Sequence, residues 1–254
     1  MAFNIEKNIV FVSGGAGDIG SSIVSAFAKE GCKIIVGDLD VEAAKSICTK
    51  LPDAEITILH TDITNMDSIQ QTIQNIEKDF GRVDTLVNVA GILCRKSIFD
   101  TEKEDFEKSL SVNVIGAFML SKAMIPLLKN SNQGAIINIS SLNGSAAVEN
   151  RVVYGATKAA LNMVSQSMAL ELGDAGITVN TVSPGVVDSK MCRVRLNTQE
   201  KIDAFCRYIP LGRLTTPDDV ASSVLFLASP FARGITGSIL LVDGGIIARQ
   251  ALPR

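Results

Sequence analysis

The sequence has no tryptophan, two tyrosines and a single histidine, His60. One histidine cannot form the kind of metal site that several imidazoles build, and we expect His60, which ends an apolar run, to be structural. The five cysteines are scattered and form no Cys-x-x-Cys pair, a pattern that favours reduced thiols over disulfides or a zinc site. We therefore expect no bound metal.

An excess of positive charge is also missing. The chain has 24 Lys and Arg against 27 Asp and Glu, which gives a formal net charge of -3. It therefore lacks the excess of basic residues that is typical of a nucleic-acid-binding protein. The first residues lack the basic region and apolar run of a signal peptide, and we expect no later stretch to have the apolar length needed to span a bilayer. These absences predict a cytoplasmic protein with neither nucleic acid nor membrane as a partner.

The chain of 254 residues does contain a regular alternation of strand and helix patterns. Short apolar runs predict strands at 9–12, 33–37, 56–59, 83–88, 135–139, 177–182 and 239–242. Helical periodicity follows the first glycine-rich turn, covers 66–80, 104–129 and 154–172, and resumes after Pro217. This order predicts an α/β fold: a single domain over 1–254 with a Rossmann-type, doubly wound parallel sheet of seven strands and helices on both faces.

One segment departs from this regular pattern. From 190 to 213 the periodicity breaks down into mixed charge and isolated apolar residues. We interpret this segment as a mobile substrate lid within the domain.

A glycine-rich turn lies between the first strand and the first helix. Gly15-x-Gly17-x-x-Gly20 has the form in which glycines let the backbone approach a pyrophosphate that sits on a helix N-terminus. Strand, glycine turn and helix are the context that this dinucleotide fingerprint requires. A phosphate-binding loop of the nucleotide-hydrolase type is excluded, because no Gly-Lys-Ser/Thr follows.

Two aspartates follow the next strands. Asp38 lies about twenty residues beyond the glycines, where a carboxylate can bind the adenosine ribose hydroxyls and repels a 2′-phosphate. The residue after Asp38 is Leu39 and not a cation, so NAD is favoured over NADP. The alternative role for Asp38 is to cap the next helix. The sequence is equally consistent with two roles for Asp62: contact with the adenine amino group, or capping of the helix that begins near Met66.

Tyr154 and Lys158 stand four residues apart in a predicted helix and therefore share one face. A phenol has a pKa of about 10, and a neighbouring ammonium lowers that value, so the pair can move a proton. The alternative is an ordinary pair on a helix surface. Other polar residues accompany the pair: Asn113 lies among apolar residues of a helix, and Ser141 follows a strand on the edge where ligands bind.

Together these motifs resemble the short-chain dehydrogenase/reductase family over nearly the whole chain. The resemblance rests on Ser13-Gly14 with Gly20, the segment Asn88–Gly91, the tetrad of Asn113, Ser141, Tyr154 and Lys158, the pair Pro184-Gly185, and the terminal motifs at 236–237 and 243–245. Several independent motifs in one order make the resemblance specific.

The resemblance implies roles for these residues. Tyr154 is the expected general acid and base, Lys158 lowers its pKa and holds the nicotinamide ribose, Ser141 binds the substrate oxygen, and Asn113 holds a water of a proton relay. Val187 and Ser189 orient the nicotinamide carboxamide. The expected cofactor contacts are Ser13, Gly14, Asp18, Ile19, Gly20, Asp38, Leu39, Asp62, Ile63, Asn88, Ala90, Gly91, Tyr154, Lys158, Pro184, Gly185, Val187 and Ser189.

Three residues depart from the family pattern. Asp18 replaces the middle glycine of the turn and brings a carboxylate close to the expected pyrophosphate, where it either weakens cofactor binding or points to solvent. Ser13 replaces a threonine and keeps the hydroxyl. Val89 replaces a second asparagine and loses one polar contact.

The expected activity is an NAD-dependent interconversion of a secondary alcohol and a ketone, in a homotetramer formed through the helices of Asn113 and Tyr154. One alternative is a 3-oxoacyl-(acyl carrier protein) reductase, which Asp38 disfavours; the arginines that such reductases offer to the carrier protein are replaced by Asn132 and Ala175. Another is a non-catalytic NAD-binding sensor or scaffold, which the intact tetrad disfavours.

The substrate is left open by the sequence. Cations in the lid and nearby loops could attract an anionic substrate or could be solvated surface charges: Arg95, Lys96, Arg151, Lys190, Arg193 and Arg195. Apolar residues could line a pocket or belong to the core: Leu142, Val148, Met191 and Ile209.

Overall fold

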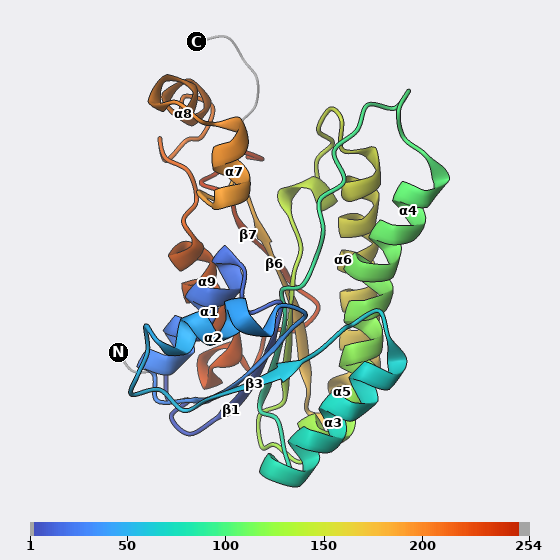
Figure 1. Ribbon diagram of the computed structural model, residues 1–254, viewed down its shortest axis with the longest axis vertical. Helices are drawn as coiled ribbons and strands as arrows, with labels where there is room; N and C mark the ends of the chain where they lie inside the picture. The colour runs from blue at the N-terminus through green and yellow to red at the C-terminus, as the bar shows by residue number, and fades with distance from the viewer. Residues whose placement is uncertain (1–2, 249–254) are drawn as a thin grey trace.

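The computed structural model describes residues 3–248, apart from the side chain of Met191. It contains one sheet of seven parallel strands in the order β3-β2-β1-β4-β5-β6-β7 (Figure 1). The strands are β1 (Ile9–Ser13), β2 (Lys33–Asp38), β3 (Ile56–His60), β4 (Thr85–Asn88), β5 (Ala135–Ile139), β6 (Thr178–Pro184) and β7 (Ile239–Val242). The expected α/β fold is confirmed, with a sixth strand that runs two residues further than its pattern indicated.

Helices cover both faces of the sheet. They are α1 (Asp18–Lys29), α2 (Val41–Cys48), α3 (Met66–Phe80), α4 (Lys103–Leu110), α5 (Ala117–Lys129), α6 (Val152–Leu172), α7 (Lys190–Arg195), α8 (Gln199–Cys206) and α9 (Pro217–Ala228). Successive strand residues point to opposite faces. Val10 and Val12 therefore pack on α1 and α9, whereas Ile9 and Phe11 pack on the side of α3, α5 and α6.

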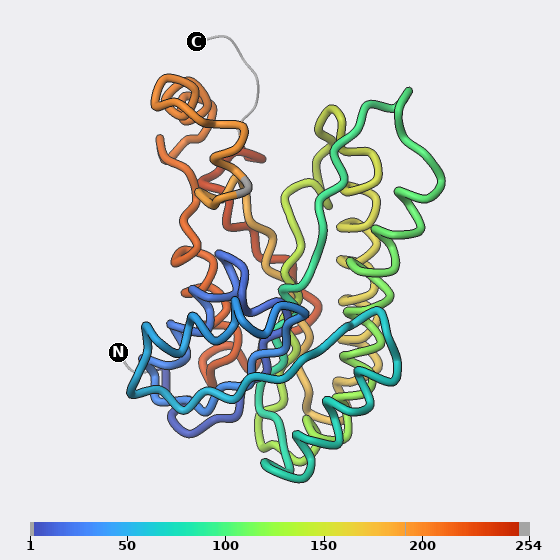
Figure 2. Tube along the Cα trace, viewed as in Figure 1, coloured from blue at the N-terminus to red at the C-terminus, as the bar shows by residue number. Residues whose placement is uncertain are grey.

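The strand order reverses at β1, which pairs with β2 on one side and with β4 on the other. In open parallel sheets, ligands bind beyond the carboxyl ends of the strands at such a reversal. Above this edge, α7 and α8 rise on one side and the 91–102 segment and the start of α6 rise on the other (Figures 1 and 2). The fold thus brings together segments that are far apart in the sequence.

A continuous helical stretch runs from Lys103 to Lys129 through α4, the π-helical turn η1 (Ser111–Gly116) and α5. This stretch is long and apolar enough, by length and composition alone, to cross a membrane, so the expectation that no stretch has that length was wrong. The π-helical turn was also not expected. Hydrogen bonding from residue i to residue i+5 is rare in proteins, and where it occurs it is often at a functional site. This turn contains Asn113.

The segment 190–213 forms two short helices where its pattern indicated no regular structure. Side chains cap both, because the Ser189 hydroxyl accepts a hydrogen bond from Cys192 N and the Thr198 hydroxyl accepts one from Lys201 N. A small separate core lies beneath them, formed by Leu196, Ile202, Ile209 and Leu214. Helices of six and eight residues are too short to leave a clear periodic signal.

Candidate active site

A groove of about 600 Å³ lies over the carboxyl ends of β1, β2 and β4 and is lined by the glycine turn before α1. Gly14 has a φ of +67°, and a side chain there would place its Cβ 2.6 Å from Ala90 Cα. A Cβ at Gly20 would collide with the carbonyl oxygen of Gly14. Glycine is therefore required at both positions for the turn and α1 to pack closely against the strand ends.

The first turn of α1 borders this groove without a capping side chain. The leading N–H groups of a helix have no partner within the helix, and a phosphate can accept their hydrogen bonds. α2, α3 and α9, by contrast, are each capped by a side chain. The uncapped end and the close-packed glycines fit the pyrophosphate of a dinucleotide.

Asp18 is hydrogen-bonded to the segment 190–213. One of its carboxylate oxygens accepts a hydrogen bond of 2.7 Å from the backbone nitrogen of Lys190, the first residue of α7. The carboxylate thus connects the start of α1 with the start of α7. This contact was not foreseen from the sequence, where the two residues are 172 positions apart.

The Asp38 carboxylate faces the groove and holds two backbone nitrogens. One oxygen accepts a hydrogen bond of 2.9 Å from Ala16 N, and the other accepts one of 3.0 Å from Asp40 N. Each carboxylate oxygen has a second lone pair for a ribose hydroxyl. The residue that caps α2 is Asp40, which accepts from Ala43 N, so the alternative that Asp38 caps this helix was wrong.

The structure also distinguishes between the two roles considered for Asp62. Asn65 caps α3, accepting hydrogen bonds from Asp67 N and Ser68 N, so the capping alternative for Asp62 was wrong. Asp62 lines the groove instead. Its Oδ1 accepts hydrogen bonds from the backbone nitrogen and the hydroxyl of Thr64, and these bonds lower the pKa of the carboxyl.

Most of the expected cofactor contacts lie in this groove: Gly14, Asp18, Ile19, Gly20, Asp38, Leu39, Asp62, Ile63, Ala90, Gly91, Tyr154, Lys158 and Ser189. Five of the expected contacts do not line it: Ser13, Asn88, Pro184, Gly185 and Val187. The Asn88 amide is buried and donates to Ser121 Oγ and Asn138 Oδ1, so it joins β4 to its neighbours, and Ser13 is also buried. A strand residue next to the ligand edge can face the core, and the sequence pattern alone does not distinguish these cases.

Tyr154 and Lys158 lie at the inner end of the groove, on the face of α6 that the i, i+4 spacing indicated. Lys158 is only 4% exposed, and its ammonium donates a hydrogen bond of 2.9 Å to the carbonyl oxygen of Ile139, the last residue of β5. The ammonium nitrogen is 5.7 Å from the centre of the Tyr154 ring. The lysine is therefore held by the sheet and directed at the tyrosine.

Burial acts on both groups. It lowers the pKa of Lys158 from 10.5 to about 8 and raises the pKa of Tyr154 above 10.0. The groups that lower the pKa of Tyr154 are Ser141, through a hydrogen bond, and the charge of Arg151. The expected direction, a phenol pKa lowered by Lys158, was therefore wrong, because desolvation outweighs the favourable interactions.

Asn113 and Gly91 complete this end of the groove. The Asn113 side chain accepts from Ile92 N at 2.8 Å and donates to Thr157 Oγ1 at 3.1 Å. A Cβ at Gly91 would lie 3.1 Å from Asn113 Oδ1 and 3.5 Å from Lys158 Nζ. Glycine thus keeps the space between the amide and the ammonium free of a side chain.

A second cavity of about 190 Å³ adjoins the groove at Tyr154. Ser141 lines it, as do Pro184, Gly185 and Val187, three of the expected cofactor contacts. Of the apolar residues considered from sequence, Leu142 lines this cavity and Ile209 belongs to the small core, while the Met191 side chain lies outside the described part of the chain.

The sequence did not single out several residues that line this second cavity. They are Leu93, Asn143, Val186, Cys192, Leu196 and Phe205. They come from loops and from α7 and α8, which carry no motif. Three arginines that the sequence did single out also line it: Arg95, Arg151 and Arg195.

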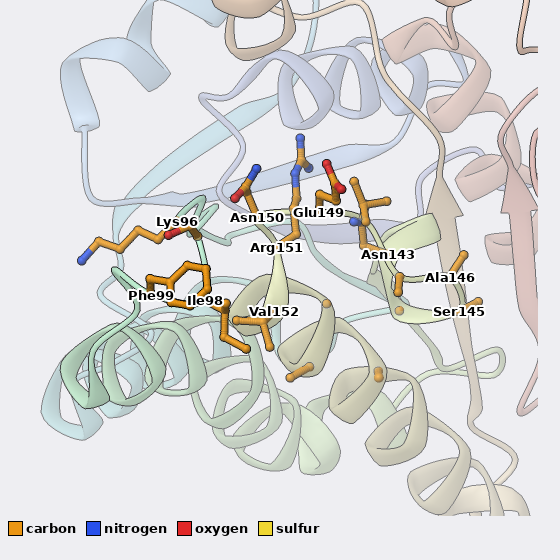
Figure 3. Close-up of a pocket in the computed structure, with 17 residues that line it drawn as sticks. Lys96, Ile98, Phe99, Asn143, Ser145, Ala146, Glu149, Asn150, Arg151 and Val152 are labelled. Carbon is orange, nitrogen blue, oxygen red and sulfur yellow. The ribbon is translucent and has the colours of Figure 1, made fainter.

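A larger hollow of about 740 Å³ lies outside the tetrad, between the 96–99 segment and the start of α6. Figure 3 shows Ile98, Phe99 and Val152 gathered on one side of it, while Asn150 and Arg151 extend to the other. None of the four tetrad residues lines this hollow, which also contains Val148. Its size alone therefore does not make it the reaction site.

Known proteins resemble this arrangement along the whole chain. Residues 14–247 match the family model described as enoyl-(acyl carrier protein) reductase. The chain is 36% identical over 248 residues to the 2,5-dichloro-2,5-cyclohexadiene-1,4-diol dehydrogenase LinX of Sphingobium indicum, a match that covers 96% of this chain and 98% of the relative. It is 35% identical over 243 residues to the 3-oxoacyl-(acyl-carrier-protein) reductase FabG of Vibrio cholerae, again covering 96% and 98%.

Among solved structures, ElxO with NADP bound matches with a TM-score of 0.90 at 30% identity, covering 96% of this chain and all of that one. The similarity therefore extends over the sheet, the groove and the second cavity together. Because the family model and these relatives match nearly the full length, the chain belongs to the short-chain dehydrogenase/reductase family and is an oxidoreductase of that type.

Proposed function

We propose that the protein interconverts a secondary alcohol and a ketone with NAD as the coenzyme. The observation that carries this proposal is the position of Tyr154, which lines both the dinucleotide-sized groove and the smaller cavity beside it. A substrate in the cavity and a nicotinamide at the inner end of the groove can both contact the phenol there. Proximity of this kind is what a direct transfer between two bound molecules requires.

The chain's own residues handle the proton. A bound nicotinamide coenzyme supplies the hydride acceptor or donor. In the oxidative direction, the Tyr154 oxygen takes the proton of the substrate hydroxyl while the carbinol carbon loses its hydride. Ser141 donates a hydrogen bond to the substrate oxygen, and Lys158 binds the nicotinamide ribose and stabilises the phenolate. Asn113 holds the water through which the proton leaves, in the space beside Gly91.

The preference for NAD is argued from Asp38. Its carboxylate lies in the groove beside the exposed Leu39, and the lysines that line the groove, Lys108 and Lys158, belong to other segments. A 2′-phosphate next to Asp38 would meet a negative charge with no neighbouring cation in the 38–39 segment. ElxO binds NADP, so the family fold by itself accommodates either coenzyme.

A reductase of 3-oxoacyl groups is a second candidate. The relative from Vibrio cholerae and the matched family model both carry acyl-carrier-protein reductase names. Small β-oxo esters, such as acetoacetyl thioesters, distinguish this activity from the oxidation of free alcohols. Asp38 disfavours it to the extent that such reduction uses NADPH.

In the first test the protein is titrated with NADH and with NADPH. Binding is detected by thermal shift and by energy transfer from the tyrosines to the bound coenzyme. We expect NADH to bind more tightly. Secondary alcohols with NAD, and ketones or 3-oxoacyl thioesters with NADH or NADPH, are then assayed at 340 nm, the absorbance of the reduced nicotinamide. If neither coenzyme binds, the enzymatic proposal is wrong and a non-catalytic role takes its place.

The same proposal includes a homotetramer. Apolar side chains are exposed on the helices that carry the tetrad: Ile115 and Phe118 in η1 and α5, and Met163 and Leu170 in α6. Exposed apolar area of this kind marks interaction surfaces. Light scattering of the purified protein is expected to give four times the mass of one chain, and a monomer would refute the assembly.

A further inference from the structure

Three arginines converge on the cavity beside Tyr154 from separate parts of the chain. Arg95 follows β4, Arg151 is the residue before α6, and Arg195 ends α7. Among the residues that the structure describes, no Asp or Glu lines this cavity. A cavity with three guanidinium groups and no carboxylate is suited to a negatively charged ligand.

These arginines also lack the partners that other nearby cations have. Arg193 forms two hydrogen bonds of 2.6 Å with Asp188, and Lys96 bonds to Asp105 at 2.7 Å. Within residues 3–248, neither an ion pair nor a side-chain hydrogen bond is made by Arg95, Arg151 or Arg195. The three arginines that line the cavity thus differ from Arg193 and Lys96, whose charges are each paired with an aspartate.

Arg151 is the most constrained of the three. It lies three residues before Tyr154 and is half-buried, and its side chain extends from the start of α6 away from α4 (Figure 3). Its pKa is lowered, first by desolvation and then by the charges of Arg95 and Arg195, while Tyr154 acts in the opposite direction. Like charges held together disfavour one another, and an anion between them relieves that cost.

A further donor lies at the same place. Asn143 lines the cavity two residues after Ser141, and its amide nitrogen is buried without a hydrogen-bond partner in the described part of the chain. Buried polar groups are normally paired, so such a donor is unusual. The cavity lining therefore includes three guanidinium groups and an amide donor that has no partner in the described part of the chain.

We propose that the substrate is a small secondary alcohol or ketone that carries an anionic head group, a carboxylate or a phosphate, which Arg151 binds with the help of Arg95 and Arg195. This inference rests on the proposed function and specifies its substrate class. The reacting oxygen lies between Ser141 and Tyr154, and the head group lies a few bonds away at the start of α6. The cavity of about 190 Å³ limits the substrate to a short chain. The reaction still balances as alcohol plus NAD⁺ giving ketone, NADH and a proton.

The experiment compares charged and neutral forms of the same substrates. Oxo acids of three to six carbons, the methyl ester of each, and dihydroxyacetone phosphate are reduced with a saturating coenzyme. We expect the wild-type kcat/KM to favour an anionic substrate over its neutral ester by roughly tenfold to a hundredfold, as charge-assisted hydrogen bonds to a guanidinium predict. Raised ionic strength should increase the KM of the anion and leave that of the ester unchanged.

Variants assign the effect to particular arginines. Arg151→Gln should lose most of the preference for the anion, through a raised KM for the anionic substrate. Arg95→Gln and Arg195→Gln, at exposed positions that tolerate substitution, should each lose roughly twofold to fivefold. Arg193→Gln is the matched control, because this arginine lies on the same helix as Arg195 but is paired with Asp188 and does not line the cavity.

Turnover of dihydroxyacetone phosphate and of none of the acids would support the anionic site and make its head group a phosphate. Equal turnover of acids and esters by the wild type would overturn the inference, and so would an equal loss in Arg193→Gln and Arg151→Gln. In both cases the proposed oxidoreductase function would stand, because its own measure is coenzyme binding with turnover of any alcohol or ketone. If coenzyme binding is absent, both proposals fail.

Discussion

The groove and the second cavity meet at Tyr154 but are built differently. The groove lies over the carboxyl ends of strands β1, β2 and β4, and its lining includes four glycines: Gly14, Gly17, Gly20 and Gly91. The cavity is lined largely by residues from loops, α7 and α8, outside the sheet. Their charges also differ, since the groove contains Asp18, Asp38 and Asp62 whereas the cavity contains three arginines.

This difference separates two tasks within one domain. A dinucleotide needs a fixed backbone surface with unpaired N–H groups, which a sheet and an uncapped helix supply. A particular substrate needs side chains that can differ without disturbing the sheet, and loops outside it supply those. The comparison predicts that substitutions in the groove change coenzyme affinity, substitutions in the cavity change substrate preference, and substitutions at Tyr154 abolish the chemistry in both directions.

The largest effect is expected at Tyr154, where the two regions meet. Tyr154→Phe removes the oxygen that exchanges the proton, and general acid-base groups contribute on the order of 10² to 10⁴ in rate. We expect kcat to fall by about a thousandfold while NADH affinity stays within about twofold, because the phenyl ring still fills its place. Steady-state assays and coenzyme titration on one preparation measure both quantities.

The second tyrosine supplies the control. Tyr208 is 64% exposed and lines neither the groove nor the second cavity. Tyr208→Phe makes the same chemical change and should leave kcat unchanged. An active Tyr154→Phe enzyme would contradict the assignment of the proton step to this residue.

The next largest effect is expected from substitution of Asp38, and it concerns coenzyme binding alone. Asp38→Asn keeps an oxygen that can accept from Ala16 N and removes the charge that repels a 2′-phosphate. We expect the ratio of the NADPH and NADH dissociation constants to fall by roughly tenfold or more, from the loss of one close charge pair. Asp62→Asn is the matched control, because that groove residue should weaken both coenzymes equally.

The opposite shifts of Lys158 and Tyr154 predict the pH dependence. Burial lowers the pKa of Lys158 to about 8, so its ammonium is present below that pH and is lost above it, while the raised pKa of Tyr154 keeps the phenol protonated over the same range. Ketone reduction needs both protons. We expect kcat/KM for reduction to fall by about fivefold between pH 8 and pH 9 as the ammonium is lost.

The measurement is a reduction profile from pH 6 to pH 10, with NADH binding and thermal unfolding recorded at each pH as controls. Burial of the ammonium also opposes folding below pH 8. Between pH 8 and about 10.4 the unfolded chain binds the additional proton, so this group's contribution to the free energy of unfolding rises with pH. A flat activity profile through pH 8 to pH 10 would show that the tyrosine alone sets the alkaline limb.

The coenzyme region was more predictable from sequence than the substrate region. Its elements repeat with a clear period, and Gly14 and Gly20 stand where backbone approaches backbone, a constraint that a sequence records directly as glycine. Tyr154 and Lys158 could be paired because helix geometry alone places i and i+4 on one face. Local rules were sufficient in these places.

Where contacts depend on distant segments, the sequence was insufficient. The hydrogen bond from Lys190 N to Asp18 joins residues 172 positions apart, and the convergence of Arg95, Arg151 and Arg195 depends on loop paths that no periodic pattern records. The direction of the Tyr154 pKa shift depended on burial, which outweighed the expected effect of the nearby lysine. The inward orientation of Asn88 at a strand end is another such case.

The smallest predicted effect concerns Asp18, the residue that joins the two regions. Asp18→Asn keeps an oxygen for Lys190 N and removes the negative charge beside the pyrophosphate site, whereas Asp18→Ala removes both. If charge repulsion is the main effect, both variants bind NADH more tightly, by roughly twofold to fivefold, as a surface-exposed charge predicts.

If the bond to α7 also positions the substrate cavity, Asp18→Ala alone should raise the substrate KM and accelerate hydrogen exchange in residues 190–195. Coenzyme titration and hydrogen exchange on the pair of variants separate these effects, and equal KM values in both would mean that α7 keeps its place without the carboxylate.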